Sequence, residues 1–189
     1  MKCLPLLLAF FLALPAWAGE PVATGAVVPN FSLLNQDGNN VKLSDFRGKV
    51  VLVTFLYTQC PFPEKCPMIS SKLEKTRALI DRVEGGRENL QVLSITLDPE
   101  NDTPEALKAY AQGMDKDFSN WSFLTSSPAT VARVASLFGV LYWDQDGTIE
   151  HNMRTALIDR QGRLHKLYSG SDWRPGELAA EVKSLIDNQ

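Results

Sequence analysis

Two long apolar segments dominate the hydrophobic pattern of the chain. VVLVTFLYT covers residues 50–58 and LQVLSITLD covers residues 90–98. Because both are rich in β-branched residues, they predict central strands that are buried on both faces of a sheet. Between them, apolar residues from Pro67 onward recur at roughly helical spacing until Gly85 and Gly86. This spacing predicts a helix that ends near the two glycines.

Shorter patterns predict the remaining elements. Two strands are expected around an Asp37–Gly38 turn in residues 31–49, and two more around a Gln161–Gly162 turn in residues 154–170. One further strand is expected in residues 120–125. Three helices are expected in residues 102–114, 127–140 and 174–187. Strands that alternate with helices predict an α/β fold, with a mixed sheet flanked by helices. The cysteine pair after the first long strand makes a thioredoxin-like fold with an N-terminal β-hairpin the best match.

The N-terminus has a separate character. Lys2 is followed by an apolar segment, Leu4–Ala18, that ends in a small-x-small pattern. This pattern is typical of a secretory signal peptide, and the segment is shorter than the roughly 20 apolar residues that a membrane span requires. We therefore expect a signal peptide over residues 1–18, one domain over residues 19–189, and a periplasmic or otherwise secreted protein without a stable membrane span. A signal that is retained as an anchor is the alternative.

The charge balance excludes one class of partner. The chain has 19 basic and 22 acidic residues, and loss of Lys2 with the signal peptide gives a net charge of 18 − 22 = −4. A mildly acidic protein without a clustered basic face is not expected to bind nucleic acid. About 170 residues remain, which is enough for one domain with its own core.

Cys60 and Cys66 lie after the first long strand, and each is followed by a proline. A residue before proline avoids the α region, so both cysteines are expected to be extended. Pro67 suits the first helical position, which makes Cys66 the expected N-cap. The positive end of the helix would then lower a thiol pKa below its usual value of about 8.5. Two thiolates in one stiff loop indicate either a redox pair or a soft-metal site, whereas a purely structural disulfide across so short a loop would add little stability.

The two histidines have different settings. His165 lies within RLHKLYSG, a segment with strand-like alternation, and is interpreted as an ordinary strand residue. His151 directly precedes the strand expected at residue 154, and in a thioredoxin-like fold the loop there faces the cysteine loop. An imidazole that joins two thiolates forms a ligand set that suits copper. An ordinary surface histidine is the alternative.

Several segments together resemble the Sco/SenC family, thioredoxin-fold copper carriers associated with assembly of the dinuclear copper centre of cytochrome c oxidase. The similarity runs through PNFSLLNQDGNNVKLSDFRGKVVLVTFLYTQCP, SITLDPENDTPEALKAYA, NWSFLT and HNMRTALIDRQGRL. It implies copper ligands at Cys60, Cys66 and His151, and cysteines that can also form a disulfide. The implied partner is the copper-bearing subunit of the oxidase or another copper carrier. One departure is that CPFPEKC places five residues between the cysteines, where the family usually has three.

An enzyme is the alternative to a carrier. As a thiol–disulfide oxidoreductase, the protein would use Cys60 to attack a partner and Cys66 to resolve the mixed disulfide. Oxidoreductases of this fold normally have a cis-proline before the strand at residue 154, and EHNMRTALID has none, which favours a metal ligand at His151. A thioredoxin-like domain with an idle disulfide is a third possibility.

Three other residues are weaker candidates for the site. Asp98 ends the second long strand and is expected either to support the metal site or to form a turn. Asp102 is expected to cap a helix, with Thr103 as the alternative cap, and Met153 is expected to fill the core. The DQDG segment at residues 144–147 is interpreted as a turn rather than a calcium loop, because it lacks the remaining ligands.

Overall fold

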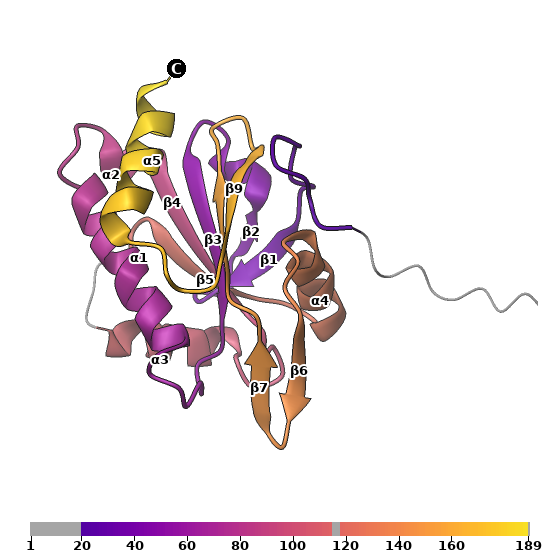
Figure 1. Cartoon of the computed structure of the whole chain (residues 1–189). Coiled ribbons are helices and arrows are strands. Elements are labelled where there is room, and N and C mark those ends of the chain that lie inside the picture. The colour runs from indigo at the N-terminus through magenta and orange to yellow at the C-terminus, as the bar shows by residue number, and fades with distance from the viewer. Residues whose placement is uncertain (1–19, 115–117, 189) are drawn as a thin grey trace, which may run out of the picture.

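The computed structural model describes residues 20–114 and 118–188, so the expected signal peptide lies outside the described residues. The described elements are, in chain order, β1 (Ser32–Asn35), β2 (Asn40–Lys42), the 3₁₀ helix η1 (Leu43–Phe46), β3 (Val50–Leu56), α1 (Cys66–Ile80), α2 (Gly86–Asn89), β4 (Leu90–Thr96), α3 (Pro104–Gly113), β5 (Trp121–Thr125), α4 (Pro128–Leu137), β6 (Tyr142–Gln145), β7 (Thr148–His151), β8 (Arg154–Ile158), β9 (Leu164–Ser169) and α5 (Pro175–Asp187) (Figure 1). In these two ranges, no helix is long and apolar enough to cross a membrane.

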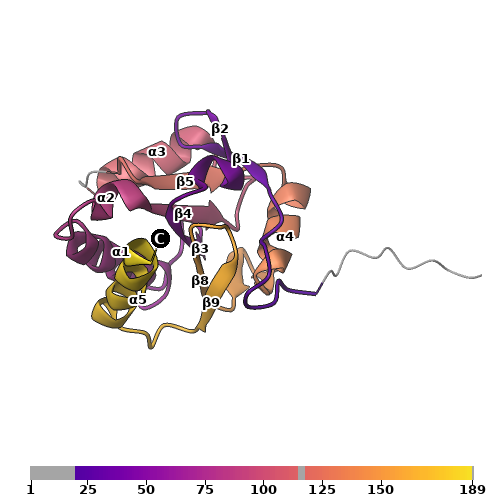
Figure 2. The same ribbon diagram turned by 90° about the horizontal axis from the view of Figure 1, so that it is seen from above.

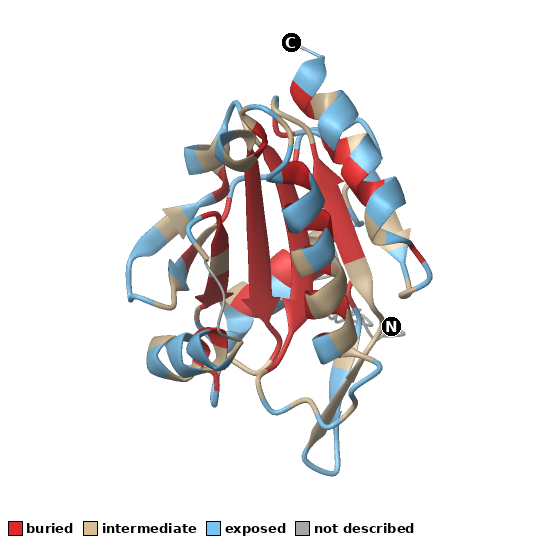
Figure 3. Cartoon of the chain, turned by 90° about the vertical axis from the view of Figure 1, so that its left-hand side faces the viewer, coloured by how far each residue is buried: buried red, intermediate tan, exposed pale blue. Residues whose placement is uncertain are grey.

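A seven-stranded mixed sheet forms the centre of the fold, with the strand order β2-β1-β5-β4-β3-β8-β9. β3 runs parallel to β4 and antiparallel to β8. Every residue of β3 and β4 is buried (Figure 3). The expected mixed α/β fold is therefore confirmed, and its two long apolar segments are the central strands.

The two faces of the sheet are covered by different helices. Alternate side chains of a strand point to opposite faces, and in β3 Val50 and Leu52 join the core beneath α1 and α5, whereas Val51 and Val53 join the core beneath α4. Figure 2 shows α1 and α5 on one side of the sheet and α4 on the other. The central strands are continuously apolar because both of their faces are covered.

A second, two-stranded sheet was not expected from the sequence. β6 and β7 form an antiparallel hairpin that pairs Tyr142 with His151 and extends from the end of the main sheet (Figure 1). The turn uses positive φ angles at Asp146 (54°) and Gly147 (81°), which suits a tight hairpin. The interpretation of DQDG as a turn is confirmed, but the strands around it were missed because most of their side chains are polar or partly exposed.

The start of α1 differs from the expectation by one residue. Lys65 is the N-cap and Cys66 is the first helical residue, so the prediction that Cys66 is an extended N-cap is wrong. Pro67 then occupies the second helical position. A proline is tolerated there because the N–H groups of the first turn have no partner within the helix.

The central strands should contribute much of the stability. Leu93 is 0% exposed in β4, whereas Leu141 is 67% exposed. We predict that Leu93→Ala lowers the free energy of unfolding by about 2–5 kcal/mol, because it removes buried methyl groups and leaves a cavity. The matched control Leu141→Ala should change it by less than about 0.5 kcal/mol. Urea unfolding of both variants measures the difference, and equal losses would contradict this assignment of the core.

Candidate metal centre

Residues 57–65 connect β3 to α1 and carry the first cysteine. The loop contains a turn in which the N–H of Lys65 donates to the carbonyl of Phe62 at 3.0 Å. The Lys65 Nζ lies 2.7 Å from Oε2 of Glu150 on β7 and 4.1 Å from the centre of the Phe62 ring. An ion pair and a cation–π contact therefore tie the end of the cysteine loop to the β6–β7 hairpin.

The second cysteine meets the histidine that the sequence singled out. Sγ of Cys66 lies 3.7 Å from Nε2 of His151. Nδ1 of the same ring lies 3.0 Å from the carbonyl oxygen of Asn152. Because a carbonyl only accepts hydrogen bonds, Nδ1 carries the ring proton and Nε2 presents its lone pair to the sulfur. This is the tautomer that a metal-binding imidazole needs.

Burial favours the neutral form of the His151 imidazole. Removal from solvent lowers its pKa below the ordinary histidine value, and the nearby positive charge of Lys65 adds to this effect. A neutral imidazole can coordinate a metal without first losing a proton.

Cys60 lies at the more accessible end of the site. It is partly exposed and, like Cys66, is a free thiol. Its Sγ lies 3.9 Å from the carbonyl oxygen of Phe62. The thiol of Cys60 is also close enough to Cys66 to affect the pKa of the second thiol. The structure thus brings the two cysteines and His151 into one region, although among the described residues no group of three His, Cys, Asp or Glu side chains has the arrangement of a formed metal site.

The electrostatics of Cys66 differ from the expectation. Cys66 is 2% exposed, and burial raises the pKa of its thiol to about 12. The expected lowering of the thiol pKa by the helix N-terminus is therefore wrong for this cysteine. Loss of hydration disfavours the thiolate more strongly than the helix end favours it.

Asp102 supports the cysteine loop and does not cap a helix. It is 0% exposed, and its carboxylate accepts hydrogen bonds from the Thr58 N–H at 3.1 Å and from the hydroxyls of Thr58 and Thr96, both at 2.5 Å. The cap of α3 is instead Thr103, whose side chain accepts from the Ala106 N–H at 3.3 Å. The predicted role of Asp102 as a cap is wrong, because its side chain points inward and joins the ends of β3 and β4.

The other candidates lie around this region. Nδ2 of Asn101 donates to both carboxylate oxygens of Asp98 at 3.0 Å, so the turn role of Asp98 has structural support. Met153 is partly buried against the core, as expected. His165 is an exposed residue of β9, also as expected.

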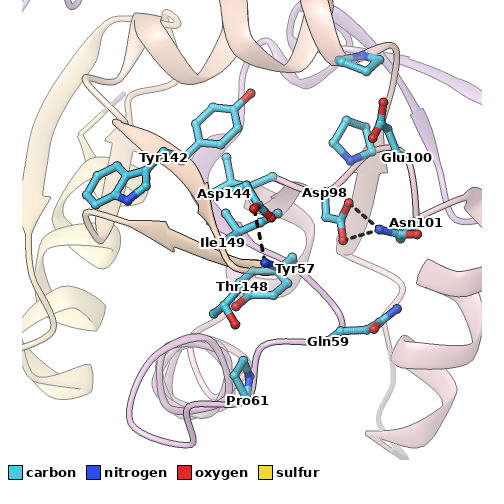
Figure 4. Close-up of a pocket in the computed structure, with 15 residues that line it drawn as sticks. Tyr57, Gln59, Pro61, Asp98, Glu100, Asn101, Tyr142, Asp144, Thr148 and Ile149 are labelled. Carbon is cyan, nitrogen blue, oxygen red and sulfur yellow. Dashed lines mark hydrogen bonds between the residues drawn. The ribbon is translucent and has the colours of Figure 1, made fainter.

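A cavity of about 620 Å³ lies next to the cysteine loop (Figure 4). Sequence reasoning missed it, together with Tyr57 in its wall and the Lys65–Glu150 ion pair. The sequence signal for the ion pair was that residues of opposite charge, Lys65 and Glu150, directly precede Cys66 and His151. The cavity itself has no signal in the sequence, because it is formed by four segments that are far apart in the chain.

The chain is similar to proteins of one family over nearly its whole described length. The sequence profile of the SCO1/SenC family matches residues 20–187. A SCO1 protein homolog of Bacillus subtilis (strain 168) is 29% identical over 181 residues, which cover 92% of this chain and 91% of the relative.

Solved structures show the same similarity. Bradyrhizobium japonicum ScoI with copper bound has a TM-score of 0.70 and 28% identity, over 85% of this chain and 99% of that chain. BsSco, described as a member of the Sco family of cytochrome c oxidase assembly proteins with a disulfide switch, has a TM-score of 0.71 and 28% identity, over 90% of this chain and 98% of that chain. The expected thioredoxin-like Sco fold is therefore confirmed.

The buried carboxylate of Asp102 predicts a pH dependence of stability. Burial raises its pKa in the folded protein, so the folded state binds this proton more tightly than the unfolded state, whose pKa is about 3.9. Its contribution to stability is therefore fully present below about pH 4 and is lost as the pH rises through the higher folded pKa. Relative to the Asp102→Asn variant, which cannot ionise at this position, the wild-type protein should become less stable as the pH rises through this interval. Urea unfolding of both proteins as a function of pH measures this, and a relative stability that rises with pH would contradict it.

Proposed function

The chain belongs to the SCO1/SenC family, and on this premise we propose that it binds copper through Cys60, Cys66 and His151 and delivers it during assembly of cytochrome c oxidase. The observation that supports this most directly is the 3.7 Å contact between Sγ of Cys66 and Nε2 of His151. It places a soft sulfur ligand beside an imidazole nitrogen that is free to coordinate.

The chemistry of the three side chains suits copper as a cargo. Two thiolates and one imidazole combine soft and borderline ligands. Cys66 is buried, whereas Cys60 is partly exposed, so Cys60 is the ligand that a partner reaches first. The Nδ1 contact of His151 with Asn152 fixes the ring, and the Lys65–Glu150 ion pair holds the cysteine loop near it. Asp98 remains a candidate for support of the site from the neighbouring turn.

The partner would be the copper-bearing subunit of cytochrome c oxidase or another copper carrier. Support comes from relatives, since ScoI of Bradyrhizobium japonicum is described with copper bound and BsSco as an oxidase assembly protein. The proposed location is periplasmic or otherwise outside the cytoplasm, after cleavage behind Ala18. The support for this location is the apolar pattern of residues 4–18.

Thiol–disulfide exchange through Cys60 and Cys66 is the second candidate function. Two observations favour it: both residues are free thiols that lie close to each other, and BsSco is described with a disulfide switch. A disulfide between Cys60 and Cys66 would withdraw both sulfur ligands, so copper binding and oxidation would exclude each other.

The identity of the histidine ligand can be tested by copper titration of the purified, reduced protein. His151→Ala should weaken copper binding by about tenfold or more and change the thiolate-to-copper absorption, because one ligand is lost. His165→Ala is the matched control, since His165 is exposed on β9, and it should leave both properties unchanged. Equal effects of the two substitutions, or no effect of His151→Ala, would reject this ligand set.

A comparison in the host separates a carrier from a reductase. His151→Ala leaves both cysteines able to exchange disulfides, whereas Cys66→Ser removes the resolving thiol. For a copper carrier, both substitutions should abolish assembly of the respiratory oxidase, measured as oxidase activity in membranes. Normal assembly with His151→Ala and loss with Cys66→Ser would instead establish the reductase.

A further inference from the structure

The cavity beside the metal centre is lined by none of the three proposed copper ligands. Its walls come from the cysteine loop, the turn after β4, Pro128 at the start of α4 and the β6–β7 hairpin (Figure 4). Gln59 and Pro61, the two neighbours of Cys60, both line it. A group bound in this cavity would therefore lie next to the more accessible of the two cysteines.

All charged side chains that line the cavity are carboxylates. Asp98 and Glu100 come from the turn after β4, and Asp144 comes from the hairpin. None of the described residues that line it is a lysine, arginine or histidine. Three carboxylates around one concave surface favour a cation and disfavour an anion.

Tyr57 links the wall of the cavity to Cys60. Tyr57 lines the cavity and is 3% exposed. Its hydroxyl oxygen lies near the Cys60 thiol and the backbone of Ile149, but it makes no hydrogen bond of normal geometry with the described residues. The hydroxyl oxygen has almost no accessible surface, so Tyr57 connects the wall of the cavity to the cysteine and does not itself bind a ligand there.

An exposed aromatic ring distinguishes among cations. Trp143 lines the cavity and remains 55% exposed, which is unusual for a large apolar side chain. A guanidinium group can stack on an indole ring while its N–H groups bind carboxylates in a planar, forked geometry. An ammonium group or a metal ion uses the carboxylates but gains less from such a planar stacking surface.

We propose that this cavity receives an arginine side chain of the protein with which copper is exchanged. The inference rests on the proposed copper function for the identity of that protein, but the arginine site itself does not require copper. The guanidinium stacks on Trp143 and pairs with Asp98, Glu100 and Asp144. Because the cavity adjoins Gln59 and Pro61, the anchored arginine places the neighbouring part of the partner beside Cys60.

The experiment is a titration of the copper-free, reduced protein with the peptide acetyl-Gly-Arg-Gly-amide, followed by the NMR signal of the Trp143 indole N–H. The peptide should shift this signal and bind more weakly as salt is added, because its contacts are partly exposed ion pairs. A matching peptide with citrulline, which keeps the shape of arginine without its charge, should not bind. A lysine peptide should bind more weakly than the arginine peptide.

Two pairs of charge changes give a matched comparison. Glu100→Gln with Asp144→Asn removes two carboxylates from the cavity and should weaken arginine binding by about fivefold. Glu177→Gln with Asp187→Asn removes two carboxylates from α5, outside the cavity, and should leave it unchanged. Trp143→Ala, followed by the backbone signals of residues 144 and 148, should also weaken binding.

The outcomes separate the arginine site from the copper function. Equal binding of the citrulline peptide, equal losses in the two double variants, or tighter binding of the lysine peptide would overturn the proposal. Copper titration of the Glu100→Gln, Asp144→Asn variant should match the wild-type protein. A protein that binds the arginine peptide but no copper would retain this site and disprove the proposed function instead.

Discussion

The pairing of β3 with β8 is the constraint on which the metal centre depends. These antiparallel neighbours place Thr54 opposite Thr155, so the end of β3 lies beside the start of β8. The chain leaves β3 toward Cys60 and Cys66, and it reaches β8 directly after His151. A sulfur and an imidazole 85 positions apart in the sequence consequently meet at 3.7 Å. The apolar side chains that bury both faces of β3 hold this register.

Burial determines the protonation of the two groups that meet there. It raises the pKa of the Cys66 thiol and lowers the pKa of the His151 imidazole, so the neutral form of each is favoured. A neutral thiol beside a neutral imidazole avoids the cost of an unpaired buried charge. A metal ion that replaces the thiol proton supplies the missing positive charge. The buried thiol–imidazole pair therefore suits a bound copper ion.

The β6–β7 hairpin connects the metal centre with the cysteine loop and the cavity. It carries His151 into the site, pairs Glu150 with Lys65 of the cysteine loop, and contributes Trp143 and Asp144 to the cavity wall. On the opposite side, the Asp102 carboxylate joins the base of the same loop to the end of β4 through Thr58 and Thr96. The cysteine loop is therefore held at both ends, while Cys60 between them remains partly exposed.

The sequence by itself determined the strands and helices of the main sheet and the fold class, because periodicity is a local property. The three proposed copper ligands came from the resemblance of the sequence to the Sco/SenC family. Only the tertiary structure revealed the hairpin, whose polar strands carry no clear apolar period, and the inward position of Asp102. It also reversed the expected pKa shift of Cys66, because the sequence shows a helix N-terminus but not the burial that outweighs it. The cavity likewise depends on four segments that the fold brings together. The burial of a side chain and the distance between remote segments are set by packing, so the local sequence pattern could not predict them.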